Sequence, residues 1–549
     1  MKQPQRPAGL RVWTPLLFSL VMIVGMVLGY RLHDTLRGKR HLSTVISRSD
    51  RLDEIIDLID AKYVDSVQTD MLYEDAIRGI LTHLDPHTVY IPASEVAQTN
   101  ESLEGSFYGI GVEYRIVNDT IQVTGLVENG PAEKAGVILA DKIIRVNDSL
   151  VAGNGITNER ITRLLRGRQH TTVRVVLQDA VKNTPRNVLI ERDEIPLYSL
   201  DASLMLDQET GYIKIARFAA TTADEFEAAL KQLKKQGMKR LVVDVRDNPG
   251  GYLDAAVDVA DQLIADNKLI VYMKGLHSEK EEFKAREEGL FETGSLAILI
   301  DEGSASASEI LAGAVQDWDR GIIIGRRSFG KGLVQEQYEL SDGSALRLTV
   351  ARYYTPSGRS IQRSFAGGKA AYVQDFQQRF ENGELTGADS LGVEDTTTFY
   401  TSRNRVVHGG GGIKPDYYVP YDSILFSSPV LSLAFSEKMD QLIWEYYVLN
   451  RAELAAYRNI DAFKAGFHDD EKLLQHFLNL QTAKDRIKIS QYLKNEKVRR
   501  FMLLHIRAGL ARILFKTNGY YSIQVAGDNC VQAALRLFNS GQYLKIIGR

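Results

Sequence analysis

Residues Asp301–Gln335 read DEGSASASEILAGAVQDWDRGIIIGRRSFGKGLVQ, and this stretch decides the fold. The apolar run Leu296–Ile300 predicts a buried strand just before it, and a helix is predicted to begin at the alternating Ser-Ala pairs and to run to about Asp317. A second apolar strand, 322–324, precedes a lysine between glycines, Lys331. The pattern indicates an α/β unit in which a serine at a helix start faces a lysine from the next strand and loop.

A serine paired with a lysine suggests nucleophilic catalysis. A serine hydroxyl needs a base to take its proton, and a lysine can be that base only when burial keeps its amine neutral. Gly330 and Gly332 allow the backbone to pack closely around the amine. The free N–H groups at the helix start suit a developing oxyanion. Without chemistry, Ser306-x-x-Glu309 is an ordinary capping box and Lys331 a solvated turn lysine.

The runs GSASASE and FGKGLVQ resemble the active-site region of the C-terminal-processing (tail-specific) serine peptidases. In that family the catalytic serine and lysine stand twenty-five positions apart, which implies Ser306 as the nucleophile and Lys331 as the base. The resemblance also implies that Gln335 orients the base. It implies a catalytic core of the ClpP/crotonase-like α/β type.

Composition narrows the class of protein. A chain of 549 residues is long enough for two or three domains, and a formal net charge of −3 gives no reason to expect a nucleic-acid partner. Cys530 is the only cysteine, so an internal disulfide is excluded. No Cys/His spacing typical of a metal site occurs, and we expect neither a metal nor an organic cofactor.

The N-terminal segment Val12–Tyr30 is uncharged and mostly apolar, and Arg11 and Arg31 bound it. Its nineteen residues are just long enough to cross a bilayer as a helix. A cleaved signal peptide and a signal anchor are both open, and the lack of a small-x-small cleavage site favours the anchor. The flanking charges do not decide orientation. The family resemblance implies a single-pass protein of the cytoplasmic membrane whose catalytic part lies on the periplasmic or extracytoplasmic side.

The region after the anchor is predicted to be helical, with helices over Ser43–Tyr63 and Met71–Leu84. The first helix carries an apolar stripe that includes Ile55 and Ile56. The run LDPHTVY at Leu84–Tyr90 ends the second helix and also resembles the family, but we assign no chemistry to its histidine. Related enzymes dimerise through such helices, so a homodimer is a hypothesis here.

Residues from Gly105 to about Ala180 resemble a PDZ domain. Three motifs in order carry the resemblance: GIGV at Gly109, Ile110, Gly111 and Val112, then PAEKAG from Pro131, then DKIIRVN from Asp141. Closely spaced N–H groups of the first motif can hold a terminal carboxylate, and the peptide then adds as a strand to an exposed edge. The resemblance implies protein substrates with accessible C-termini, held by these four residues. The groove helix is predicted over Ile156–Leu165.

The catalytic core continues the α/β pattern. Strands are predicted over Gly211–Phe218 and Leu241–Val245, with a helix begun by a capping box, Thr222-x-x-Glu225, between them. The second strand leads into RDNPGG. The resemblance implies that a glycine of this loop and the amide of Ala307 form the oxyanion hole. Whether Gly250 or Gly251 donates stays open at this stage.

Four later segments have no motif. His277–Glu292 is predicted to be a charged, solvated excursion, and the polar insertion between Phe365 and His408 has no assigned role beyond a lid or surface arm. Ser427–Phe515 is predicted to be helical. The tail, Gly519–Arg549, is predicted to combine a short strand-like piece with a last helix over 529–538. A helical cap on the core, or an interaction arm, is the expected role of the C-terminal region.

The chain is thus expected to contain a cytoplasmic tip and signal anchor (1–40), a helical region (41–100), a PDZ domain (101–185), a serine peptidase core (186–425) and a mostly helical C-terminal region (426–549). The expected function is a membrane-anchored serine endopeptidase with a Ser-Lys dyad that cleaves exported proteins by their C-terminal tails. Two alternatives remain: an inactive PDZ tether for protein C-termini, and a crotonase-type hydratase acting on acyl thioesters.

Overall fold

The computed structural model of the chain describes residues 22, 50–179, 184–265, 267–387, 397–426 and 429–548. The chain divides into two compact units, Met1–Ile80 and Leu81–Arg549. Within the described residues, no helix combines the length and apolar character needed to cross a bilayer. The predicted anchor, Val12–Tyr30, lies outside the described residues apart from Met22.

Two helices, α2 (Asp50–Lys62) and α3 (Thr69–Leu81), form the described start of the chain. On the predicted apolar stripe of α2, Ile56 is buried, whereas Ile55 is 54% exposed. The second helix ends three residues before the predicted Leu84. Leu84 N donates to the carbonyl of Leu81 at 3.2 Å, so a turn replaces the last predicted residues of the helix.

The largest hydrophobic core of the chain is built on a six-stranded sheet in the order β10-β11-β12-β15-β16-β21. The pair β10 and β11 is antiparallel, and every other neighbouring pair is parallel. The central strands are continuous apolar runs because both faces of the sheet are covered. The strands are β10 (Leu200–Met205), β11 (Thr210–Ile215), β12 (Arg240–Asp244), β15 (Ser295–Ile300), β16 (Ile322–Gly325) and β21 (Tyr417–Tyr418).

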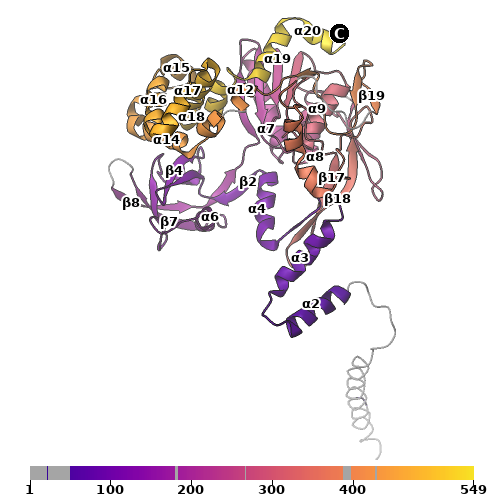
Figure 1. Cartoon of the computed structure of the whole chain (residues 1–549), viewed down its shortest axis with the longest axis horizontal. Helices are drawn as coiled ribbons and strands as arrows, with labels where there is room; N and C mark the ends of the chain where they lie inside the picture. The colour runs from indigo at the N-terminus through magenta and orange to yellow at the C-terminus, as the bar shows by residue number, and fades with distance from the viewer. Residues whose placement is uncertain are drawn as a thin grey trace, which may run out of the picture. The chain divides into compact units, whose positions relative to one another are not determined.

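Helices pack on both faces of this sheet (Figure 1). One face lies against α7 (Thr222–Lys235), α8 (Leu253–Asp261) and α9 (Ala307–Asp317), which bury Phe226, Val257 and Leu311 among others. The other face is covered from the far end of the chain by α19 (Asn529–Asn539) and α20 (Gln542–Ile546). The C-terminal segment therefore completes the core, which agrees with the expected cap.

Two sequence-based predictions in this unit are wrong in detail. The helix α7 has no capping box: the hydroxyl of Thr222 donates to Ser199 Oγ, and the Glu225 carboxylate accepts from the backbone of Ser199 and Leu200. These tertiary partners take the two side chains that would have formed the local cap. The tail contains no strand among its described residues, because Gly519–Gln524 is the helical last part of α18 (Glu496–Gln524), which follows a kink at Phe515 and Lys516.

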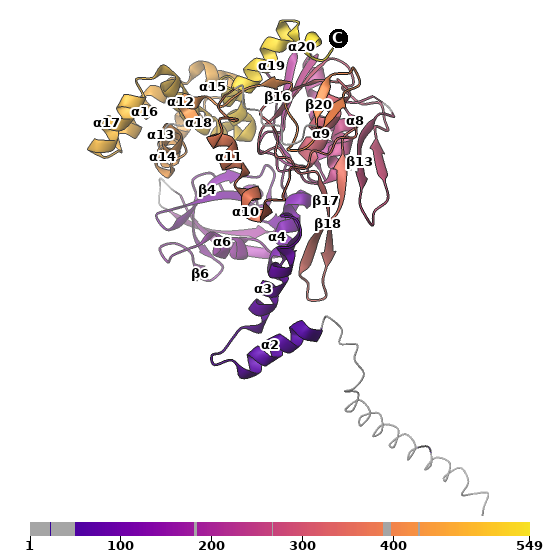
Figure 2. The same ribbon diagram turned by 45° about the vertical axis from the view of Figure 1, so that its right-hand side comes forward.

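A second sheet has the order β1-β18-β13-β14, and β17 pairs with β18. Its strands are β1 (Val89–Ile91), β13 (Leu269–Lys274), β14 (Glu281–Lys284), β17 (Leu333–Glu339) and β18 (Ala345–Tyr354). The hairpin of β17 and β18 is long (Figure 2). The predicted solvated excursion His277–Glu292 is partly wrong, because it includes β14. Cross-strand pairing with β13 stabilises this charged segment as an edge strand.

A third sheet, in the order β3-β4-β5-β7-β8 with β6 beside β5, has a core of its own. The strands are β3 (Val112–Val117), β4 (Thr120–Leu126), β5 (Lys142–Val146), β6 (Ser149–Leu150), β7 (Thr172–Gln178) and β8 (Pro185–Glu191). The helices are α5 (Pro131–Lys134) and α6 (Asn158–Leu165), and α4 (Ala93–Glu104) precedes the unit. The strands β2 (Ser106–Gly109) and β9 (Asp193–Pro196) pair where the chain enters and leaves it.

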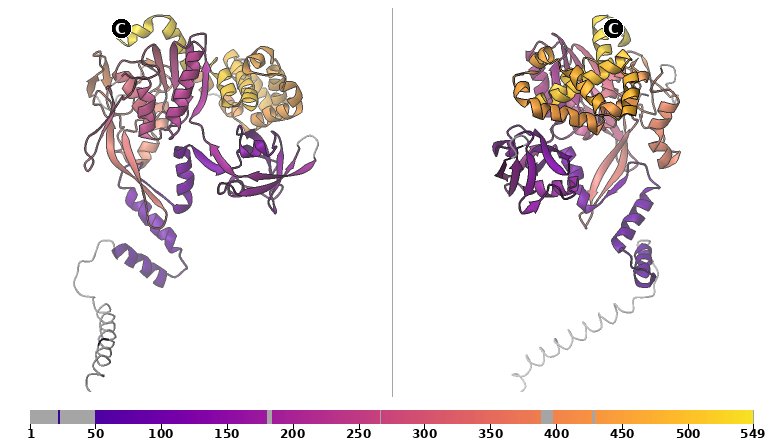
Figure 3. Two further views of the ribbon diagram at one scale, coloured as in Figure 1. Left: turned by 180° about the vertical axis from the view of Figure 1, so that it is seen from behind. Right: turned by 60° about the vertical axis from the view of Figure 1, so that its left-hand side comes forward.

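The C-terminal helices form a compact group with a separate core (Figure 3). They are α12 (Ser423–Phe426), α13 (Pro429–Ala434), α14 (Glu437–Leu454), α15 (Ile460–Gly466), α16 (Asp470–Asn479), α17 (Ala483–Tyr492) and the long α18. The insertion after Phe365 contains α10 (Gly368–Val373), α11 (Asp375–Glu381), β19 (Thr398–Tyr400) and β20 (Val406–His408).

Candidate active site

Ser306 lies between the buried strand β15 and the start of α9, as the sequence predicts. Its backbone has φ 54° and ψ −111°, a conformation that is costly for a residue with a side chain. Hydrogen bonds around it hold this geometry, since Ser306 N donates to Glu309 Oε2 at 2.9 Å. The side chain is half-buried at the helix N-terminus. Strain held in this way is common at reactive positions, which fits a nucleophile.

Lys331 lies in the loop between β16 and β17. Its Nζ donates to Gln335 Oε1 at 2.9 Å, so the predicted base and its predicted orienting residue are in contact. Burial lowers the pKa of Lys331, and the positive charge of Arg347 lowers it further, while Asp85 and Glu309 act in the opposite direction. A lowered pKa increases the fraction of neutral amine, which is the form that can accept a proton.

The carboxyl of Glu309 ties the serine loop to the lysine loop. Its Oε2 accepts from the backbone N of Ser306 and of Lys331, both at 2.9 Å. Its Oε1 accepts from Ser328 Oγ at 2.5 Å and from Gly330 N at 2.7 Å. Burial raises the pKa of Glu309 to about 7, against these four hydrogen bonds, which lower it. In the sequence, Glu309 stands out only as half of a capping box, and nothing there indicates its contact with the second loop.

Tyr353, on β18, makes a second tie between the same two loops. Its hydroxyl lies 3.0 Å from the carbonyl oxygen of Ser306 and 2.6 Å from that of Lys331, and its one proton is shared between these two acceptors. The side chain is fully buried. Tyr353 belongs to no motif that the sequence singles out, so nothing in the sequence indicates this role.

The loop after β12 packs directly on the serine loop. Ala305 N donates to the carbonyl of Asn248 at 3.0 Å, and a Cβ added to Gly250 would meet Ala307 N at 3.0 Å. Gly250 N donates to Asn248 Oδ1 at 2.8 Å. Among the described residues, no hydrogen-bond acceptor is assigned to Gly251 N or to Ala307 N. Of the two candidate glycines, Gly251 therefore has the N–H that is available to a ligand.

The turn before β1 contributes to the site in a way the sequence analysis did not anticipate. The carbonyl of His87 accepts from Gln335 Nε2 at 2.5 Å, which fixes the amide that orients Lys331. The His87 ring lies beside Tyr372, with Nε2 2.8 Å from the phenolic oxygen. Burial, followed by the charge of Lys331, lowers the pKa of His87 to about 4, so the ring is neutral near pH 7. The LDPHTVY motif is the sequence feature that could have indicated a role for this turn. The motif contributes the backbone carbonyl of His87 to the site.

The predicted carboxylate loop, Gly109–Val112, leads into β3, and β3 lies at the edge of its sheet. Gly111 has φ +74°, and a Cβ there would meet Ile195 Cδ1 at 3.1 Å. Ile110 accepts from Ala132 N through its carbonyl, which fixes the loop against α5. The geometry provides what a peptide that adds to a sheet edge requires, namely an edge strand that begins at a glycine-containing loop.

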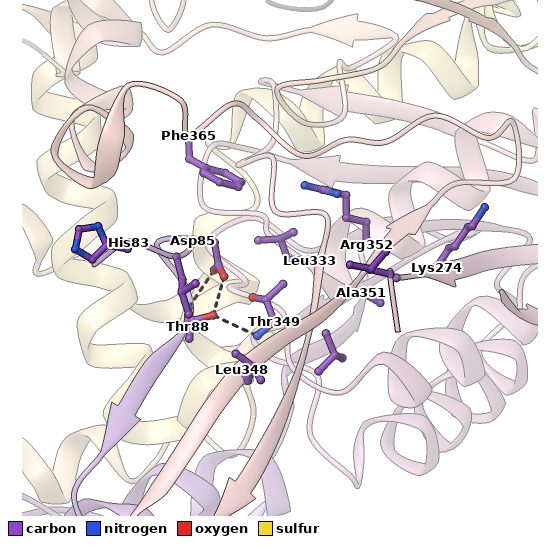
Figure 4. Close-up of a pocket in the computed structure, with 14 residues that line it drawn as sticks. His83, Asp85, Thr88, Lys274, Leu333, Leu348, Thr349, Ala351, Arg352 and Phe365 are labelled. Carbon is purple, nitrogen blue, oxygen red and sulfur yellow. Dashed lines mark hydrogen bonds between the residues drawn. The ribbon is translucent and has the colours of Figure 1, made fainter. Parts of the chain in front are cut away.

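A pocket of about 370 Å³ opens beside β18 (Figure 4). Its lining includes Leu333 and Phe365, with Asp85 and Lys274 among its charged side chains. Neither member of the predicted dyad lines it. Among the described residues, no group of three or more His, Cys, Asp or Glu side chains is arranged to hold a metal ion.

Comparison with known proteins identifies the family. Residues 209–369 match the model of Peptidase family S41. A carboxy-terminal-processing protease of Bartonella bacilliformis is 33% identical over 344 residues, which are 62% of this chain and 78% of that protein. The chain belongs to peptidase family S41. The predicted resemblance to the C-terminal-processing peptidases is thereby confirmed.

Two solved structures are also similar to parts of the chain. A photosystem II D1 C-terminal processing protease is 31% identical and covers 58% of this chain and 91% of its own, with a TM-score of 0.33. The PDZ domain of a carboxy-terminal protease from Vibrio cholerae is 27% identical and covers 17% of this chain and 99% of its own, with a TM-score of 0.16. As a member of family S41, this protein is a serine peptidase with a mixed α/β fold.

Proposed function

We propose that this S41 peptidase is an endopeptidase that uses Ser306 and Lys331 as a catalytic dyad and recognises the C-terminal tails of its protein substrates. The observation that carries the proposal is the shared support of the two loops. Glu309 and Tyr353 each bind the backbone of both Ser306 and Lys331. Hydrogen bonds that hold both loops fix the two side chains relative to each other, as is required when both act on one peptide bond.

In the proposed reaction, neutral Lys331 takes the hydroxyl proton as Ser306 Oγ attacks the carbonyl carbon of the scissile peptide bond. The carbonyl oxygen becomes an oxyanion, and the N–H groups of Ala307 and Gly251 donate to it. Lys331 then gives its proton to the departing amine as the C–N bond breaks. A water molecule attacks the resulting ester with Lys331 again as base, and the ester breaks to release the acid and restore Ser306.

Gln335 makes this proton transfer directional. A neutral amine has two N–H donors and one lone pair. When Gln335 Oε1 accepts one N–H, the range of directions open to the lone pair narrows. Residues of the chain supply the nucleophile, the base and the oxyanion donors of the proposed reaction. The proposed reaction uses no metal or organic cofactor.

The proposed binding step uses the loop Gly109–Val112 for the terminal carboxylate and the edge of β3 for the peptide backbone. The relatives' names, which refer to carboxy-terminal processing, support this choice of substrate. We also propose that Val12–Tyr30 anchors the chain in the cytoplasmic membrane, with the catalytic unit on the extracytoplasmic side, and that the chain forms a homodimer. The support is the length of the apolar run for the anchor and the family resemblance for orientation and self-association.

The test is cleavage of a tagged unfolded protein with a free C-terminus by the chain without residues 1–40. We expect cleavage by the wild type and loss of at least about 10³-fold in Ser306→Ala and in Lys331→Ala, because each removes a group that the chemical step requires. Binding without cleavage by the wild type would instead identify an inactive tether. Turnover of an acyl thioester would identify a hydratase.

A further inference from the structure

The insertion after Phe365 packs against the loop that carries Lys331. Arg379, buried on α11, donates to the carbonyl of Arg327 at 2.6 Å and to that of Ser328 at 3.3 Å. Glu384 accepts from Arg327 Nε at 2.7 Å and from Arg379 Nε at 3.0 Å. All three charged side chains are buried, and Glu384 pairs with both arginines. A free surface arm, one of the roles considered for this segment, would not bury such a group.

Tyr372, on α10 of the same insertion, is enclosed by three parts of the active site. The Arg363 guanidinium lies 3.7 Å from the centre of its ring, and the ring of Phe329 lies 6.0 Å away. Phe329 precedes the catalytic lysine by two residues. The third neighbour is His87, whose Nε2 is 2.8 Å from the Tyr372 hydroxyl. The side chain of Tyr372 is only 5% exposed.

A path of contacts leads from this hydroxyl to the base. The Tyr372 hydroxyl holds the His87 ring, and the carbonyl of His87 accepts from Gln335 Nε2. The other end of the same amide, Gln335 Oε1, accepts from Lys331 Nζ. If the His87 carbonyl moved, the amide of Gln335 would lose its fixed orientation. A rotated amide would present its NH₂ group to the amine and leave the lone pair undirected.

We propose that Tyr372 is a positioning residue of the reaction, which acts through His87 and Gln335 on Lys331. The inference rests on the proposed Ser-Lys chemistry and extends it to a segment that the sequence analysis left without a role. The hydroxyl makes the connection to His87, and it also has side-chain hydrogen bonds with Arg363 and Gln362. Removal of the oxygen alone keeps the ring's packing against Phe329, and a double-mutant cycle with Gln335 separates the path through His87 from the other two bonds.

The first experiment compares Tyr372→Phe with wild type in the full-length chain, with a fluorescent unfolded polypeptide that has a free C-terminus as substrate. We expect kcat to fall by roughly three- to tenfold, the effect of losing the bond that holds the His87 ring, with KM unchanged. Tyr400→Phe is the matched control, because Tyr400 is a 59% exposed tyrosine of the same insertion. A wild-type kcat in Tyr372→Phe, or a raised KM with unchanged kcat, would overturn the proposal.

The second experiment tests the path with a double-mutant cycle. If Tyr372 acts through Gln335, Tyr372→Phe has no further effect on kcat in the Gln335→Ala background. Independent, multiplying effects would show that Tyr372 acts by another route and contradict the proposal. The Ser306→Ala variant distinguishes a failure of the proposed function from a failure of the proposed role of Tyr372. Full cleavage in Ser306→Ala would reject the proposed function, whereas an inactive Ser306→Ala with a fully active Tyr372→Phe would reject only the role of Tyr372.

Discussion

Among single residues, two buried titratable groups of the site differ in how many hydrogen bonds they make. Glu309 is fully buried and accepts four hydrogen bonds, while Lys331 has one described side-chain partner, Gln335. An unpaired buried ammonium is costly, so the environment favours the neutral amine. Arg347, on β18, adds a positive charge that acts in the same direction.

The pH dependence of cleavage follows from this arrangement. Lys331 is a base only when neutral, so kcat/KM rises with pH through the pKa of its amine, which burial and then Arg347 place below the ordinary lysine value. Arg347→Gln removes a repelling charge and raises the pKa of Lys331. We therefore expect the ascending limb of the pH profile to move to higher pH.

The matched control for that profile is Arg352→Gln, since Arg352 is an exposed arginine on the same strand. It is expected to leave the limb in place. Profiles of kcat/KM measured for the three proteins check the prediction. A limb that stays at the wild-type position in Arg347→Gln would contradict the assignment of this limb to Lys331.

At the scale of elements, the last helices of the chain connect to the oxyanion loop. Asp528 caps α19 by accepting from Cys530 N at 2.9 Å and Val531 N at 3.0 Å. It also pairs with Arg246, which precedes the loop and is bound to the buried Asp244. Burial alone would raise the pKa of Asp244, but Arg246 and Lys214 lower it below the ordinary value. The N-terminus of α19 is thus held to the sheet by the ion pair of Asp528 with Arg246, and the rest of the helix by apolar contacts.

A pair of substitutions at Asp528 separates these two contributions. Asp528→Asn keeps an oxygen that can accept from the helix N-terminus and loses only the charge, whereas Asp528→Ala loses both. We expect the amides of α19 to lose about 1 kcal/mol of protection in the alanine variant and clearly less in the asparagine variant. Hydrogen exchange of peptides from α19 measures the difference. Equal losses would show that the ion pair, not the cap, dominates.

At the scale of the whole molecule, the unit from β2 to β9 has its own core and the proposed peptide site, whereas the proposed chemistry lies on other strands. The unit contacts the C-terminal helices through Trp444 Nε1, which donates to Gln122 Oε1 at 2.8 Å on β4. Arg115 on β3 pairs with Asp440 at 3.1 Å. Substrate capture and bond cleavage are therefore assigned to separate parts of one chain.

This separation predicts that capture can be removed without damage to the chemistry. In Gly111→Ala the left-handed φ and the contact with Ile195 both strain the carboxylate loop, so we expect peptides to bind at least about tenfold more weakly. Peptide binding is measured with the Ser306→Ala chain by fluorescence anisotropy. An amidated peptide is the control and is expected to bind weakly to both forms. Labelling of Ser306 by a small fluorophosphonate should stay at the wild-type rate in Gly111→Ala.

The sequence by itself determined the features that depend on local order along the chain. Buried strands such as Leu296–Ile300, the helix start at Ser306 and the spacing to Lys331 were all predictable, because apolar runs and turn residues act over a few neighbours. The family followed from the same motifs. A helical cap on the core was one of the two roles expected for the C-terminal region, although α19 contains no motif.

Only the tertiary structure decided which distant side chains meet. Asn248 Oδ1 occupies the N–H of Gly250, which is why Gly251 is the glycine that we propose for the oxyanion. Glu309 binds two loops because β16 returns the chain beside α9. His87 and Tyr372 are 285 positions apart in the sequence and meet near Lys331. No periodicity along a chain encodes such contacts, because they arise from the packing of separate elements around one site.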